Sequence, residues 1–212
     1  MKTHRVVAML GAALMAVAGS ALAQEYEDLP LDQEIKLAMS AGPPTISRDA
    51  DIYVFGASGF ERAVEGRNEW SCLVVRSAAD SRQLAPMCLN PFATRSVLPA
   101  YLVEGQLQRE GMAQGAIEEE LLRRFDRGEL PTPEGPAYTY MLSSGQRIGP
   151  NAGQFKPHFM LYMPGATNEL IGGDPGNQAF PFVGPFEGHP LATVVIIMDE
   201  FVHPDDMVIP GT

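Results

Sequence analysis

Two residues suited to chemistry, His158 and Met160, stand two positions apart in the segment HFMLYM. Residues at i and i+2 of a strand project from the same face, so the imidazole and the thioether would face the same way. Both groups bind copper, and a transition-metal site is therefore one hypothesis for this pair. The alternative is a structural histidine beside a methionine that fills the core, which explains both residues without a metal.

Glu134 is a second candidate, because it lies in the turn sequence PEGP just before an expected strand. A hydrolase-like site that combines His158 with carboxylates near Glu134 is the hypothesis that follows. His189 and His203 each precede a proline and are expected to be solvated loop residues. The sequence contains no H-E-x-x-H, G-x-S-x-G or C-x-x-C motif, no phosphate loop and no dinucleotide-binding fingerprint. We therefore predict no cofactor, and the sequence leaves open whether the protein is an enzyme.

Cys72 and Cys88 are the only cysteines of the chain. Two cysteines in an exported protein predict one disulfide, and closing the loop between them would stabilise the fold by about 3 kcal/mol on the chain-entropy model. The alternative is a pair of free thiols, one of them a nucleophile. An oxidising compartment and the even number of cysteines both favour the bridge.

Export is expected from residues 1–23, which have the features of a secretory signal peptide. Lys2, His4 and Arg5 form a basic start, an apolar run follows, and the small-residue pattern Ala-Leu-Ala ends at Ala23. A membrane anchor is the alternative, but the apolar run is shorter than the roughly 20 residues of a spanning helix. We expect a periplasmic or secreted protein with no membrane insertion after cleavage.

The chain is acidic, with 26 aspartate and glutamate residues against 15 lysine and arginine residues and a net charge of −11. Removal of the first 23 residues takes away Lys2 and Arg5 and no acidic residue, so the mature chain is more acidic still. Such a chain is repelled by nucleic acid and by anionic lipid, so we predict no nucleic-acid partner. The sequence identifies no other partner.

Hydrophobic periodicity and turn residues predict the elements that position these residues. Helices are expected at 31–41, from Ser96 to about 111, and at 113–127. Strands are expected at 51–55, 60–64, 70–75, 137–142, 158–163, 180–183 and 191–198, the first three paired in antiparallel fashion through short glycine turns. Residues 77–90 are expected to be a polar loop fixed by Cys88.

This order of elements predicts a single α+β domain over residues 24–212, with two or three helices packed on a largely antiparallel sheet. Residues 164–190 are rich in glycine and proline and are expected to be a long loop. Loops of this length in compact domains are often binding loops or lids, and otherwise disordered segments.

Four segments, FERAVEGRNEWSCLVVRS, PMCLNPFATRSVLP, ELPTPEGPAYTYMLS and FKPHFMLYMPG, occur in this order between residues 60 and 165. In them the chain resembles an uncharacterised family of exported bacterial proteins, a resemblance that implies no established activity, cofactor or catalytic residue. The hypothesis we favour is an exported, non-catalytic protein that binds a small molecule or a partner. The hydrolase-like enzyme and the His/Met metal binder remain the alternatives.

Overall fold

The computed structural model describes residues 25–184 and 186–210, so the expected signal peptide lies outside the described residues. The helices are α1 (Leu31–Met39), α2 (Pro44–Ser47), α3 (Pro91–Ser96), α4 (Leu98–Arg109), α5 (Gln114–Asp126) and α6 (Asn168–Ile171). The strands are β1 (Asp51–Gly56), β2 (Gly59–Val64), β3 (Ser71–Val75), β4 (Ala85–Leu89), β5 (Tyr138–Met141), β6 (His158–Tyr162), β7 (Phe182–Val183) and β8 (Thr193–Ile197). Short 3₁₀ segments are η1 (Pro150–Ala152) and η2 (Pro204–Asp206).

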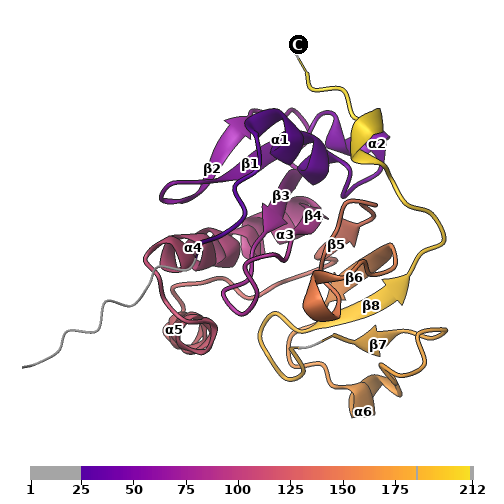
Figure 1. Ribbon diagram of the computed structural model, residues 1–212. Coiled ribbons are helices and arrows are strands. Elements are labelled where there is room, and N and C mark those ends of the chain that lie inside the picture. Colours follow the sequence, from indigo (N-terminus) through magenta and orange to yellow (C-terminus); the bar gives the residue numbers. More distant parts are fainter. Residues whose placement is uncertain (1–24, 185, 211–212) are drawn as a thin grey trace, which may run out of the picture.

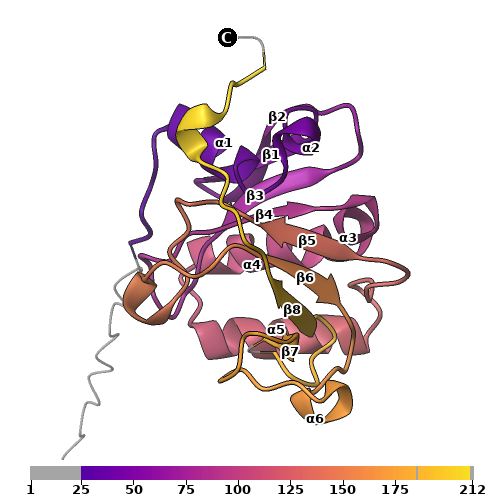
Figure 2. The ribbon, with the colours of Figure 1, turned by 90° about the vertical axis from the view of Figure 1, so that its right-hand side faces the viewer.

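The strands of the described chain form one eight-stranded sheet in the order β2-β1-β3-β4-β5-β6-β8-β7 (Figure 1). Every neighbouring pair is antiparallel except β1 and β3, which are parallel. Helix α1 packs on one face over β1, β3 and β4, and α4 and α5 lie on the other face (Figure 2). The predicted α+β class with a largely antiparallel sheet is confirmed. The short helices α2, α3 and α6 add to the two or three that were expected.

The centre of the sheet is buried on both faces because helices cover both. All five residues of β3 are buried. Leu73 and Met87 pack toward α4 and α5, whereas Cys72 and Cys88 pack toward α1. The two cysteines lie directly opposite each other on β3 and β4 and form the predicted disulfide, which is confirmed.

The expected antiparallel pairing of β3 with its predecessor is wrong. β3 pairs in parallel with β1, and β2 lies at the edge of the sheet. The central residues of β2 are exposed charged or small side chains, whereas β3 is apolar throughout, so burial favours β3 as the internal neighbour of β1. The segment that connects β2 to β3 passes close to the backbone of Ala50 and Asp51 at Gly66. A Cβ atom at position 66 would collide with that backbone, so this connection requires glycine.

The expected loop at 77–90 is also wrong in its second half, because residues 85–89 form β4 beside β3. This short apolar strand was not predicted because it contains Pro86 and follows a run of polar residues, both of which are typical of a loop. Proline donates no ladder hydrogen bond, but β5 pairs with β4 only at Cys88 and Leu89, so the sheet is incomplete beside Pro86. Cys88 is therefore a strand residue of the sheet centre.

The helix expected to begin at Ser96 is α4, which begins at Leu98, and it is preceded by a separate short helix, α3, which begins at Pro91. Asn90 is its N-cap, and the Asn90 side-chain oxygen accepts a hydrogen bond of 2.9 Å from the Ala93 N–H. Asparagine followed by proline is a favoured cap and first helical residue. Helix α3 ends before Val97, and α4 then begins at Leu98 with Pro99 in its first turn.

The α1 face of the sheet carries an aromatic cluster beyond the edge of α1. Trp70, Tyr138, Tyr140 and Phe159 contact one another there through stacked and edge-to-face pairs. Further along, Ile196 of β8 is 36% exposed. No helix of the described chain is long and apolar enough to cross a membrane.

Candidate functional site

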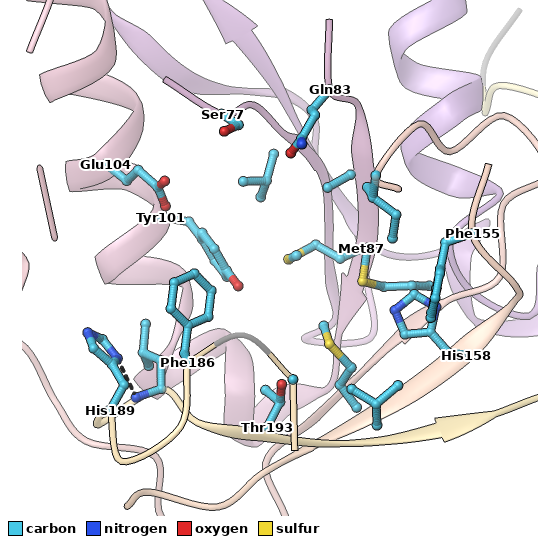
Figure 3. Close-up of a pocket in the computed structure, with 18 of the residues that line it drawn as sticks. Ser77, Gln83, Met87, Tyr101, Glu104, Phe155, His158, Phe186, His189 and Thr193 are labelled. Atoms are coloured by element: carbon cyan, nitrogen blue, oxygen red, sulfur yellow. Dashed lines mark hydrogen bonds between the residues drawn. The ribbon is translucent and has the colours of Figure 1, made fainter. Parts of the chain in front are cut away.

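A cavity of about 440 Å³ lies between the sheet and helices α4 and α5 (Figure 3). Strands β3, β4, β5, β6 and β8 form its floor, α4 and α5 form one wall, and parts of 148–155 and 175–191 complete it. This volume is within the range of about 300–1,000 Å³ that is common for small-molecule sites. The segment 164–190, expected to be a loop, contains α6 and β7 and contributes several lining residues.

The floor of the cavity is apolar because of the alternation along its strands. Met87, Met141 and Met160 face the cavity from β4, β5 and β6, and Val195 faces it from β8. Phe155 and other aromatic side chains of the loops lie at the sides (Figure 3). An unbranched thioether side chain adapts its shape readily, which suits a surface that must contact a ligand.

The helical wall is acidic. Tyr101 and Glu104 come from one turn of α4, and Gln114 and Glu118 come from one turn of α5. The Gln114 side-chain amide donates a hydrogen bond of 3.1 Å to Glu118. Glu104 accepts only a long contact of 3.4 Å, from Gln108. Both carboxyl groups therefore border a largely apolar space.

Burial strongly perturbs the titration of this wall. Burial, with a smaller contribution from the negative charge of Glu118, raises the pKa of Glu104 to about 8. Burial also raises the pKa of Tyr101 to about 12. The Tyr101 hydroxyl lies 3.4 Å from the hydroxyl of Tyr162, whose pKa burial raises well above its usual value. At neutral pH, Glu104 and both tyrosines consequently carry their protons and can donate hydrogen bonds.

His158 lies on the opposite side of the cavity from Glu104 and Tyr101 (Figure 3). Its side chain is buried, and its Nδ1 lies 2.8 Å from the main-chain oxygen of Lys156. A carbonyl oxygen can only accept, so Nδ1 carries the proton and Nε2 carries a lone pair. Burial lowers the pKa of His158, which keeps the ring neutral at neutral pH.

The structure places the predicted site residues as follows. His158 and Met160 both line the cavity and share one face of β6. Glu134 is exposed in the segment before β5 and does not line the cavity, so it is not brought together with His158 there. His189, expected to be a solvated loop residue, is partly buried in the cavity wall, where its Nδ1 accepts a hydrogen bond from the Leu191 N–H. His203 is exposed, as expected.

The acidic wall was not predicted from the sequence. Glu104 and Glu118 lie on helices whose polar residues normally face solvent, and the apolar stripe of α5 gave no sign that Glu118 borders a cavity. The available signal was Glu104 itself, an acid between Val103 and Gly105 three residues after Tyr101. In an amphipathic helix, an acid among apolar neighbours indicates the edge of the buried face.

Within residues 25–184 and 186–210, no cluster of three or more histidine, cysteine, aspartate or glutamate side chains could hold a metal ion. Comparisons of the chain with protein-family models, with curated proteins and with solved structures found no match. The function must therefore be inferred from the geometry of the cavity.

Proposed function

We propose that the protein is a non-catalytic binding module that holds a small, largely apolar molecule in the cavity between the sheet and helices α4 and α5. The cavity of about 440 Å³, with its largely apolar lining and its few polar groups, is the observation that supports this function. Such a combination is typical of ligand sites, where apolar contact provides affinity and a few polar groups fix orientation.

The chemistry of the wall indicates which polar group the ligand carries. Protonated Glu104 and the Tyr101 hydroxyl are donors, and the Glu118 carboxyl group lies in the same wall. A carboxylate or phosphate on the ligand would meet Glu118 in a medium of low polarity, where repulsion between like charges is strong. We therefore expect a neutral or basic ligand that offers a hydrogen-bond acceptor or an amine to this wall.

Binding without catalysis fits the arrangement better than the hydrolase-like alternative. A general base and a carboxylate that assists it must reach the same reacting group. Glu134 lies outside the cavity, and Glu104 lies across the cavity from His158 (Figure 3). The N–H of His158 is directed to a main-chain carbonyl, which orients the ring but supplies no acidic partner.

The location we propose is the periplasm or the cell exterior. The Cys72–Cys88 disulfide supports an oxidising compartment, since such bonds are rare in the reducing cytosol. The basic and apolar pattern of residues 1–23 and the resemblance to exported bacterial proteins point the same way. The acidic chain argues against a nucleic-acid partner.

N-phenyl-1-naphthylamine, a neutral apolar dye that fluoresces in apolar surroundings, tests this function. We expect the wild-type protein to bind one dye per chain, because the cavity is preformed and apolar. Met160→Trp fills the cavity from its floor and should weaken dye binding at least about tenfold, the equivalent of about 1.4 kcal/mol.

Leu161→Trp is the matched control, because Leu161 is the next residue of β6 and projects to the opposite face. Both variants are first checked for cooperative thermal unfolding, and the control should bind the dye as the wild type does. Absence of saturable dye binding to the wild type, or equal binding by Met160→Trp, would refute a ligand site in this cavity.

A further inference from the structure

The register of the sheet brings soft metal ligands together on the cavity floor. Met141 of β5 pairs directly with His158 of β6. Met87 lies one residue beyond Cys88, where the pairing of β4 with β5 ends, and it lines the same cavity as Met141 and His158. Met160 stands two residues along β6 from His158 on the same face.

Met141 and His158 are direct cross-strand neighbours. Residues directly opposite on adjacent strands have Cβ atoms about 4.5–5.5 Å apart. Each methionine has three rotatable side-chain bonds, which allow the sulfur atoms to converge toward the imidazole of His158. Figure 3 shows Met87 and His158 among the side chains that line the cavity.

The hydrogen bond of the His158 ring holds it in a tautomer and an orientation that suit metal coordination. Its Nδ1–H donates to the Lys156 carbonyl at 2.8 Å, which fixes both the tautomer and the orientation of the ring. Metal-binding histidines commonly donate their second N–H to a carbonyl or carboxylate in this way. Because Nδ1 carries the proton that is donated to this carbonyl, the Nε2 lone pair remains available.

We infer that Met87, Met141, Met160 and His158 bind one Cu(I) ion on the cavity floor. Three thioethers and one imidazole form a soft, uncharged ligand set, which selects Cu(I) over the harder divalent ions. A purely structural role for the methionines requires only apolar volume, which leucine supplies equally well. Cu(I) binding requires the sulfur atoms. This inference goes beyond the proposed binding of an organic molecule and does not depend on it.

Competition for Cu(I) against the chromophoric chelator bicinchoninate, in the absence of oxygen and with the full-length chain, tests the inference. We expect the wild-type protein to withdraw one Cu(I) per chain from the chelator. Loss of a hydrogen-bond partner of a ligand commonly costs 10–100-fold in metal affinity, so loss of a ligand itself should cost at least about tenfold. Met141→Leu and His158→Asn should each weaken Cu(I) binding by this factor, and the triple variant Met87→Leu/Met141→Leu/Met160→Leu should abolish it.

Met163→Leu is the matched control for chemistry and position. Met163 follows β6 directly but belongs to the alternate face, and it does not line the cavity. This variant should bind Cu(I) as the wild type does, and X-ray absorption of the loaded wild type should show sulfur and nitrogen neighbours. Failure of the wild type to compete with the chelator, or wild-type affinity in the folded triple variant, would overturn the inference. Dye binding measured on the metal-free protein reports separately on the organic ligand.

Discussion

Replacing Glu104 by glutamine is expected to remove a pH-dependent loss of stability. In the unfolded chain Glu104 titrates near the ordinary glutamate pKa of 4.5, whereas in the folded protein its pKa is about 8. Below pH 4.5 both states are protonated. Between pH 4.5 and about 8 the unfolded chain loses this proton while the folded protein keeps it, so unfolding becomes more favourable as pH rises. Above about pH 8 the loss is complete.

The magnitude follows from the difference between the two pKa values. A tenfold change in a dissociation constant corresponds to about 1.4 kcal/mol, so an ordinary glutamate and a pKa of about 8 set an upper limit near 5 kcal/mol. Glu104 is only partly buried, and water in the cavity reduces the cost of its charge. We therefore expect the free energy of unfolding of Glu104→Gln, relative to wild type, to rise by about 2–3 kcal/mol between pH 5 and pH 9.

Urea unfolding at pH 5, 7 and 9 measures this difference. His189, whose pKa burial lowers, lies in the same cavity wall, but it is common to both proteins. Glu110→Gln, an exposed substitution directly after α4, is the matched control and should show no such change. The reasoning is refuted if Glu104→Gln and wild type keep a constant difference across this range, because Glu104 would then titrate as an ordinary exposed acid.

Two further predictions concern the covalent and ionic links of the sheet. Cys72→Ala/Cys88→Ala should lower the free energy of unfolding by about 3 kcal/mol in urea titrations. Unreduced, denatured wild-type protein should contain no titratable thiol, and finding two free thiols would contradict the bridge. Glu34→Ala leaves Arg76, whose side chain is 0% exposed and 3.1 Å from Glu34, without its buried partner, and should cost about 3–5 kcal/mol. Glu129→Ala, which breaks an exposed pair with Arg127, should cost less than about 1 kcal/mol in the same assay, and an equal cost for the two pairs would contradict this reasoning.

Much of the fold could be predicted because its longer elements carry their own signals. Helix α5 follows the Ile117–Leu121–Phe125 stripe, and α1 ends just before a Gly-Pro-Pro sequence. The errors arose where the deciding contact is distant in the sequence. Pro86 is tolerated in β4 because β5 leaves the adjacent edge incomplete, and β3 lies beside β1 because β2 is too polar to be internal. Local sequence patterns do not contain such contacts.

The candidate site was predictable only in part for the same reason. The i, i+2 spacing on one strand identified His158 and Met160 from the sequence alone. Glu104 and Glu118 border a cavity because α4 and α5 leave part of the sheet uncovered. How much of the sheet remains uncovered depends on the number of strands in it. A helix pattern cannot show where such a sheet ends, so Glu104 and Glu118 resembled ordinary surface acids.

The strand arrangement adds further candidate ligands to the metal site that His158 and Met160 suggested from the sequence. His158 and Met160 alone are two ligands, too few to retain an ion against water, and core filling explained them equally well. The assignment of residues 77–90 as a loop removed Met87 from consideration, because a loop residue has no register with β5. With β4 in place, Met87 lines the same cavity as the cross-strand pair Met141 and His158, although it is far from both in the sequence. Leucine at these positions would preserve the packing and remove the sulfur atoms, so the methionine-to-leucine series separates ligation from core filling.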